Sequence, residues 1–355
     1  MVARDPVEDL RRIAFLLERA NEKTYRVQAF RGAAATLGKL SAEEIATRAA
    51  DGTLTKLSGV GDVTARCVVE SLRGEEPVYL RRMAATEGED VGEAAAALRR
   101  ALKGDCHCHS NWSDGGSPIE EMVTAAIDLG HSYLVLTDHS PRLTVARGLP
   151  AEKLREQIDV VAALNATLEQ SGVDFRLLTG IEVDILADGS LDQEDDLLAA
   201  LDVVVGSVHS GLKDERDVMT RRMLRAIENP HLDILGHCTG RRLALGGEGG
   251  DRAHRAGRGR AESQFDAAAV FKACADGGKA VEINSRPDRL DPPKRLLREA
   301  YEAGCVFTID TDAHAPGQLD WLHSGCERAA LCGVEADRVV NTWSRDRLLA
   351  WAGDH

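Results

Sequence analysis

The sequence predicts an α/β fold: a closed barrel of parallel strands, preceded by a small all-helical domain. From Gly104 onward, short apolar or β-branched runs alternate with helical patterns, as in a parallel sheet joined by helical crossovers. Seven such runs in about 250 residues favour a barrel over an open sheet. Before Gly104 only helical patterns occur. We therefore expect a helical domain over residues 1–86, a linker over 87–103 and a barrel domain over 104–355.

Three helices are predicted at the start of the chain. Asp5-Pro6 opens a pattern of apolar residues at helix spacing that continues to Arg19. A second helix is expected over Thr24–Leu37, and Ser41 with Glu44 forms a capping box for a third. These short amphipathic helices indicate a compact helical unit.

A glycine turn follows these helices. Gly59-Val60-Gly61 leads into an amphipathic helix that carries Arg66, and glycines let the backbone approach a phosphate at a helix start. This pattern resembles the hairpin of a helix-hairpin-helix module, which holds the DNA backbone without reading sequence. Asp62 opposes phosphate binding, whereas Lys56 and Arg66 offset its charge. The alternative is a plain turn between two packed helices.

The barrel elements are predicted after a helical connector over 87–103. The expected strands lie at residues 105–109, 133–137, 175–183, 202–208, 232–235, 280–283 and 305–309. The expected helices lie at 117–129, 151–170, 191–200, 215–228, 263–276, 294–303, 322–332 and 345–352. Parallel strands with such crossovers open all their carboxyl ends onto one rim of a barrel.

Candidate metal ligands follow the strands. His107 and His109 are two residues apart on the first strand, so both rings project from one face, while Cys106 and Cys108 point to the other and pack as small apolar residues. The later runs are followed by, or contain, further residues that can coordinate a metal: Asp138, His139, Glu182, His209, His237, Asp310, Asp312 and His314. We expect these side chains to meet in one bowl at the barrel rim.

Composition restricts the location and partners. The chain has a net charge of −14, and residues 1–100 are balanced with 16 basic and 16 acidic residues, so the excess acid lies in the barrel domain. An acidic domain repels nucleic acid except where bound cations reverse the field, which makes the neutral helical domain the better DNA contact. The sequence shows no secretion signal or membrane-spanning run, and its eight cysteines are scattered. We expect a cytoplasmic protein with reduced thiols.

The segment from Asp105 onward resembles the PHP (polymerase and histidinol phosphatase) family. The resemblance rests on the phrases DCHCHSNWSDG, YLVLTDHS, LDVVVGSVHS, DILGHCTGR, AVEINSRPDRLDPP and TIDTDAH, together with the region around Glu182. The phrases YRVQAFRGAA and LSGVGDVTA resemble the N-terminal DNA-binding domain of bacterial family X DNA polymerases. In that family a polymerase palm lies between the two parts, whereas here a short linker joins them.

The resemblance implies a distorted seven-stranded β/α barrel with three divalent metal ions. Carried over by position, His107, His109, Glu182 and Asp312 hold the first ion, and Glu182 bridges to a second that His209 and His237 complete. Asp114, His139 and His314 hold the third. The mixture of imidazoles and carboxylates suits Zn²⁺, Mn²⁺ or Fe²⁺. Cys238 stands where relatives often have proline; it either tunes or oxidises the site, or is an inert packed thiol.

Phosphoester hydrolysis is the chemistry that such a site implies. A water shared by two ions loses its proton near neutral pH, and the third ion neutralises phosphate oxygens. Arg241 is expected either to bind phosphate oxygens in a fork or to be a surface residue. Asp138 and Asp310 are expected to orient ligands. The Gly- and Arg-rich loop over 246–263 either fastens a DNA backbone or is a loop without a ligand.

We therefore expect a metal-dependent phosphoesterase that acts on DNA, as a 3′–5′ exonuclease or a 3′-end processing enzyme in repair. A small-molecule phosphatase of histidinol-phosphate or nucleotide type is the alternative, with the N-terminal helices serving as a cap or an oligomer contact. A non-catalytic DNA-binding adaptor is a third hypothesis, which the complete ligand set disfavours.

Overall fold

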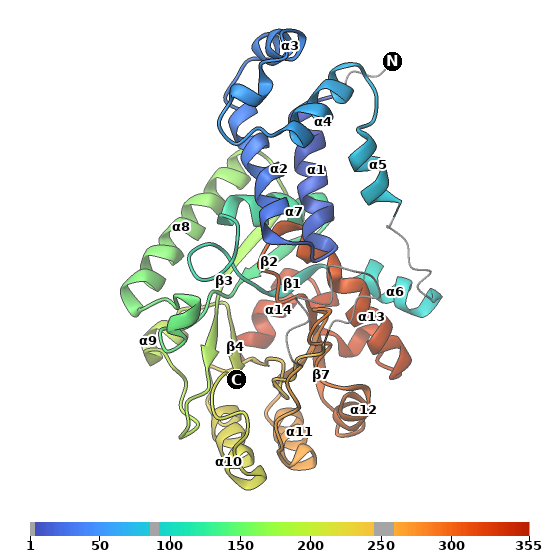
Figure 1. Ribbon diagram of the computed structural model, residues 1–355. Coiled ribbons are helices and arrows are strands. Elements are labelled where there is room, and N and C mark those ends of the chain that lie inside the picture. The colour runs from blue at the N-terminus through green and yellow to red at the C-terminus, as the bar shows by residue number, and fades with distance from the viewer. Residues whose placement is uncertain (1–3, 86–91, 245–258, 355) are drawn as a thin grey trace. The chain divides into compact units, whose positions relative to one another are not determined.

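The computed structural model describes residues 4–85, 92–244 and 259–354, and the chain divides into two compact units. The first unit comprises Met1–Asp90 with Pro316–Gln318, and the second comprises Val91–Ala315 with Leu319–His355. Figure 1 shows the helices and strands of both. In the part of the chain that is described, no helix is long and apolar enough to cross a membrane.

The first unit is helical, as predicted. Its helices are α1 (Pro6–Arg19), α2 (Thr24–Leu37), α3 (Ala42–Ala50), α4 (Asp62–Leu72) and α5 (Val78–Ala84). The Asp5 carboxylate accepts hydrogen bonds from the amides of Val7 and Glu8, and the Ser41 side chain accepts one from Glu44, so both predicted helix starts are capped. Leu10, Ile13 and Leu17 lie fully buried along one stripe of α1, which places that helix at the centre of the core.

The second unit contains the seven-stranded sheet. Its strands are β1 (Gly104–Cys108), β2 (Tyr133–Leu136), β3 (Arg176–Asp184), β4 (Val203–Ser207), β5 (Ile234–Leu235), β6 (Ala280–Asn284) and β7 (Val306–Asp310). Its helices are α6 (Glu93–Ala101), α7 (Ile119–Asp128), α8 (Ala151–Gln170), α9 (Asp195–Leu198), α10 (Arg216–Ile227), α11 (Ala267–Asp276), α12 (Lys294–Glu302), α13 (Leu322–Leu331) and α14 (Arg345–Ala352). In Figure 1 the crossover helices lie around the outside of the strands.

The strands form a nearly closed parallel barrel, which confirms the predicted fold. They follow one another in the order β1 to β7, all neighbouring pairs are parallel, and a parallel bridge between Cys108 and Ala313 joins the two edges. The barrel is irregular: the pairing of β1 with β2 shifts register between Asp105 and Cys108. β5 contains only Ile234–Leu235, so the strand predicted over 232–235 was too long.

The barrel interior changes from apolar to polar along the strands. Leu178 and Glu182 are four residues apart on β3, so both face the interior, whereas Ile181 and Val183 face the surrounding helices. Leu178 belongs to an apolar cluster with Cys106, Tyr133 and other residues, and Leu348 of α14 packs into the same cluster. The polar end, where Glu182 lies, is therefore the carboxyl end of the strands.

Two predicted segments differ from the observed structure. The expected helix over 191–200 is only the short α9, because Leu191 pairs with Ile185 and the Asp192 carboxylate accepts hydrogen bonds from Ser140 and Arg142. In the expected connector over 87–103, α6 packs Ala95 and Leu98 into the barrel unit's core. The described part of that connector is thus built into the barrel unit.

Candidate metal centre

All nine predicted ligands lie at the carboxyl ends of strands in the barrel unit, or in the loops directly after them. Eight are buried or nearly so, and Asp114 is the most exposed, with 35% of its side chain accessible. Asp312, directly after β7, has a left-handed backbone with φ of 51°, a conformation that aspartate tolerates better than most residues. The closed barrel therefore brings together ligands separated by about 200 residues in sequence.

Glu182 is the centre of the cluster. Its Oε1 lies 2.7 Å from His237 Nε2 and 3.3 Å from His209 Nε2. Its Oε2 lies 2.8 Å from His139 Nδ1, 3.4 Å from His107 Nε2 and 3.5 Å from His109 Nε2. Five imidazoles therefore surround one carboxylate, and the bridging role that the family resemblance implies for Glu182 stays a prediction.

A second set of contacts surrounds Asp114 and Asp312. Asp114 Oδ1 lies 3.3 Å from His314 Nε2 and 3.4 Å from His139 Nε2. Asp312 Oδ1 lies 3.5 Å from both His109 Nε2 and His314 Nδ1. The cluster is therefore continuous from Glu182 to Asp114.

The donor atoms fit bound cations. Among the described residues, buried nitrogens of five histidines and the Oε2 of Glu182 form no hydrogen bond, although Oε2 lies 2.8 Å from His139 Nδ1; the histidines are His107, His109, His139, His209 and His237. Unsatisfied buried polar atoms are costly. Three groups have ligand atoms within 4.8 Å of one another and could each hold an ion: His107, His109 and Asp312; His139, Glu182 and His209; and His109, Asp114, His139 and His314. These groups share members with the three predicted ligand sets.

The protonation states of the clustered histidines and of Glu182 depend on one another. Burial disfavours the protonated form of His107, yet Glu282 and Glu182 raise its pKa well above the ordinary value. Burial and the neighbouring His314 and His139 rings hold the pKa of His109 well below it. Burial alone would raise the pKa of Glu182, but the surrounding imidazoles hold it well below its usual range. Glu182 therefore stays ionised and available as a ligand.

Two carboxylates that the sequence analysis did not assign support the ligands. Glu282 is fully buried; its Oε1 lies 2.6 Å from His107 Nδ1, and its Oε2 accepts the His237 amide at 2.5 Å. Asp184 accepts the His209 amide at 3.1 Å. A carboxylate on Nδ1 favours the tautomer whose Nε2 lone pair is free for a metal. The signal for Glu282 was present in the sequence, as an acidic residue inside an apolar strand.

Asp138 and Asp310 hold the segments that carry the candidate ligands, and their expected role in orienting those ligands stays a prediction. Asp138 accepts hydrogen bonds from the Ser110 amide, the hydroxyls of Ser110 and Ser113, and the Gln157 amide group. Asp310 accepts one from the Cys106 amide at 2.8 Å. Asp138 thereby fixes the turn between His109 and Asp114, and Asp310 fixes β1.

The arginines beside the cluster are not the one singled out in the sequence. Arg286 Nη1 lies 3.3 Å from Asp312 Oδ1 and 3.2 Å from His314 Nδ1, and Arg289 Nε lies 2.8 Å from Asp312 Oδ2. Arg241 donates to the carbonyls of Arg289 and Leu290 and lies 3.7 Å from Glu262. Arg241 thus holds the segment that carries Arg289, and a phosphate contact by Arg241 remains a prediction.

The cysteines pack as apolar residues. All eight are buried and unpaired. Cys106 joins the apolar cluster inside the barrel, and Cys108 donates to the Val135 carbonyl at 3.2 Å. Cys238 lies 3.9 Å from Asp291, and burial raises the pKa of its thiol well above the ordinary value. A buried thiol with a raised pKa is unreactive, which favours an inert packed Cys238 over one that tunes or oxidises the site.

The predicted DNA-binding turn lies in the first unit, at the start of α4. Gly59 has φ of +82° and Val60 is buried, while Gly61, Asp62 and Arg66 are exposed. The Gly61 amide is already used, because it donates to Thr64 Oγ1 at 3.0 Å. A phosphate would therefore have to meet the later amides of the α4 start, next to Asp62. Residues 246–258 of the predicted Gly- and Arg-rich loop lie outside the described residues.

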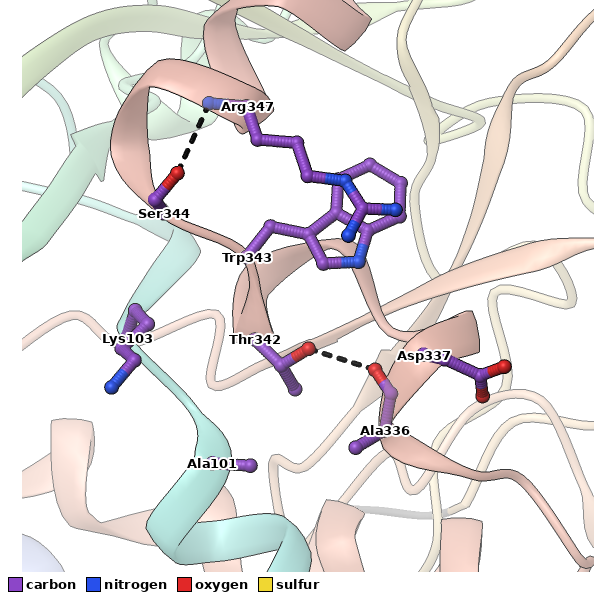
Figure 2. Close-up of a pocket in the computed structure, with 8 residues that line it drawn as sticks. All are labelled: Ala101, Lys103, Ala336, Asp337, Thr342, Trp343, Ser344 and Arg347. Atoms are coloured by element: carbon purple, nitrogen blue, oxygen red, sulfur yellow. Dashed lines mark hydrogen bonds between the residues drawn. The ribbon is translucent and has the colours of Figure 1, made fainter.

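A groove in the barrel unit lies away from the cluster. It has a volume of about 570 Å³, and Lys103, Trp343 and Arg347 are among its lining residues (Figure 2). Arg347 lies over the Trp343 ring at 3.9 Å. Lys103 directly precedes β1, so the groove is at the amino end of that strand, opposite to the ligands.

Comparison with known proteins identifies two domains in this chain. Residues 105–286 match the PHP domain model, and residues 1–76 match a helix-hairpin-helix domain model. The DNA polymerase/3′-5′ exonuclease PolX of Bacillus subtilis is 40% identical over 243 residues, which are 68% of this chain and 40% of the relative. The chain thus spans about two fifths of that relative's length.

Other relatives are shorter proteins. A probable phosphatase of Thermoanaerobacter sp. is 26% identical over 253 residues, covering 67% of this chain and 89% of the relative. The crystal structure of histidinol phosphate phosphatase from Lactococcus lactis, complexed with zinc, L-histidinol and phosphate, aligns with a TM-score of 0.44 and 19% identity over 72% of this chain and 95% of that one. With the PHP model spanning about half of its residues, this chain belongs to the PHP domain family.

Proposed function

We propose that the chain is a metal-dependent phosphoesterase that cleaves DNA at or near a 3′ end. The observation that carries this proposal is the presence, in one chain, of a helix-hairpin-helix domain and a PHP barrel in which nine candidate ligands cluster. The similarity to a polymerase with 3′–5′ exonuclease activity supports the same substrate. Three divalent ions, of Zn²⁺, Mn²⁺ or Fe²⁺ type, are part of the proposal.

The bound ions would supply activation of water and neutralisation of phosphate charge. The chain's own residues prepare the site for them. Glu282 accepts the Nδ1 proton of His107 and leaves its Nε2 directed at Glu182. Asp184 positions the backbone of His209, and Asp138 positions the turn that leads to Asp114. Burial of the ligands keeps the electrostatic interactions strong.

Arg286 is the side chain best placed to meet a phosphate. Its side chain is 19% exposed, and its Nη1 contacts both Asp312 and His314. A guanidinium at the edge of a ligand cluster can bind two phosphate oxygens while remaining paired with a carboxylate. Arg289, which is only 5% exposed, is better suited to hold Asp312 in place.

The decisive assay compares DNA with a small ester. Wild-type protein, loaded with Mn²⁺, is incubated with 5′-labelled single-stranded and nicked DNA, and separately with bis(p-nitrophenyl) phosphate. We expect shortening of DNA from the 3′ end, and loss of both activities in His209→Ala. Turnover of the small ester with intact DNA would contradict the proposal.

A matched pair of variants tests the helical domain. Arg66 is exposed near the start of α4, and Arg73 is exposed just beyond its end. If the α4 start holds the DNA backbone, Arg66→Glu raises KM for DNA while Arg73→Glu has a smaller effect, and neither changes hydrolysis of the small ester.

The second candidate function is a small-molecule phosphatase. It is favoured by the probable phosphatases that this chain matches over most of their own length. It predicts rapid hydrolysis of phosphomonoesters such as histidinol phosphate or a nucleotide, with no effect of Arg66→Glu on any substrate.

A further inference from the structure

One loop of the barrel unit closes back onto a metal ligand. Residues 140–149, named here the rim loop, connect His139 to α8. The Leu149 amide donates to the His139 carbonyl at 2.7 Å, and the Ser140 amide donates to the Glu182 carbonyl at 3.0 Å. Both ends of the rim loop are therefore fastened to the ligand segments at the carboxyl ends of β2 and β3.

The rim loop is held in a defined shape. The Ser140 hydroxyl and the Arg142 amide both donate to Asp192 Oδ2, at 2.8 and 2.6 Å. Gly148 lies so close to Ser140 that an added Cβ would be 1.8 Å from the Ser140 carbonyl oxygen. Ala146 and Leu149 are buried. A loop tied in this way presents its exposed side chains without first having to become ordered.

The exposed side chains of the rim loop are unusual for a plain connection. Val145 is 93% exposed, the highest value among the exposed large hydrophobic residues of the described chain. Arg147 has a left-handed backbone with φ of 58°, which costs energy for a residue other than glycine. The fold thus keeps an exposed apolar tip, and a strained arginine two residues away, in a loop whose ends are bonded to the backbone of His139 and Glu182.

The rim loop also concentrates positive charge. Arg142 and Arg147 are both exposed, and within the described residues neither guanidinium has a hydrogen bond or an ion pair. The barrel part of the chain carries all of the net charge of −14. Two unpaired arginines in such a domain form a local attraction for an anion near the site.

We propose that the rim loop binds the DNA strand that enters the metal centre, with Arg142 and Arg147 on backbone phosphates and Val145 against a sugar or base. This inference rests on the proposed DNA activity and names the element that would select a strand over a small ester. A polymer extends beyond the ligand cluster and reaches the rim, whereas a small ester does not. Two cations flanking an apolar tip match the alternation of phosphates and apolar sugar and base faces in a single strand.

The test uses the full chain with Mn²⁺ and two substrates, a labelled single-stranded oligonucleotide and bis(p-nitrophenyl) phosphate. The variants are Val145→Ser and the double variant Arg142→Ser/Arg147→Asn, where asparagine tolerates the left-handed backbone. The matched control is Arg176→Asn, because Arg176 is exposed at the amino end of β3, away from the ligands.

We expect the double variant to lower kcat/KM for the oligonucleotide about tenfold, and Val145→Ser to lower it about threefold. The slope of log(kcat/KM) against log[KCl] is negative, and loss of two phosphate contacts should make it less steep by about 1.4, at roughly 0.7 per contact on a single strand. Hydrolysis of the small ester should stay within about twofold of wild type, and Arg176→Asn should behave as wild type on both substrates.

Several outcomes would overturn the inference. If the variants cleave DNA as wild type does, the rim loop does not bind the strand, although the proposed DNA activity stands. If they lose DNA and ester hydrolysis equally, the loop acts only by supporting His139. If wild-type protein hydrolyses the ester but not DNA, the proposed function fails first, and the inference fails with it.

Discussion

Glu282→Gln tests whether the metal centre depends on a carboxylate outside the predicted ligand set. Glu282 is fully buried and makes two contacts with ligands: Oε1 faces His107 Nδ1 at 2.6 Å, and Oε2 accepts the His237 amide at 2.5 Å. Glutamine has nearly the same shape, but it offers one acceptor and one donor group. Glutamine at this position therefore cannot accept a hydrogen bond from both His107 Nδ1 and the His237 amide.

Either orientation of the amide is unfavourable. If its NH₂ group faces the His237 amide, two donors meet in a buried position. If its NH₂ group faces His107, Nδ1 must accept, which moves the ring proton to Nε2 and removes that atom as a ligand. A hydrogen bond to a charged group contributes about 1.5–3 kcal/mol, and about 1.4 kcal/mol corresponds to a factor of ten. We expect Mn²⁺ affinity at the weakened site to fall by about 10- to 100-fold.

Competition with a metal chelator, with the bound metal measured by elemental analysis, gives the affinity without relying on activity. Glu302→Gln is the matched control, because Glu302 is exposed at the end of α12. Circular dichroism and thermal melting show whether each variant is folded. A folded Glu282→Gln protein with the Mn²⁺ affinity of wild type would refute the role assigned to Glu282.

Three other predictions follow from buried groups. Burial raises the pKa of Asp233 to about 7, so the folded protein binds more protons than the unfolded chain between pH 4 and 7, and its stability falls as the pH rises through this range. The Tm of Asp233→Asn minus the Tm of wild type should therefore be larger at pH 7.5 than at pH 4. A difference in Tm that does not vary with pH would contradict this. Asp138 accepts three hydrogen bonds from the Ser110–Ser113 turn and one from Gln157, so Asp138→Asn should reduce the metal content at the Asp114 end of the cluster, measured by elemental analysis of folded protein. The eight buried thiols should resist Ellman's reagent in the folded protein and react together on unfolding in urea, and rapid labelling of Cys238 in the native state would show that its thiol is not inert.

The sequence by itself determined the fold class and the candidate ligand residues. Apolar runs and helical patterns are local properties, so the strands and most helices were predictable to within a few residues. Ligands such as His209 and His237 directly follow apolar strands, and in a parallel barrel the carboxyl end of a strand is the functional end. Their convergence could therefore be predicted before any distance was known.

Only the tertiary structure decided which groups support the ligands. Glu282 and His107 are separated by 175 positions in sequence, and their contact exists because β6 and β1 face the same interior. The same closure places Arg286 and Arg289 against Asp312, while Arg241, the arginine singled out in the sequence, donates to the carbonyls of Arg289 and Leu290. Local patterns carry no information on which of several arginines a distant carboxylate will meet. That choice is made by the closure of the barrel, which fixes side-chain directions across strands.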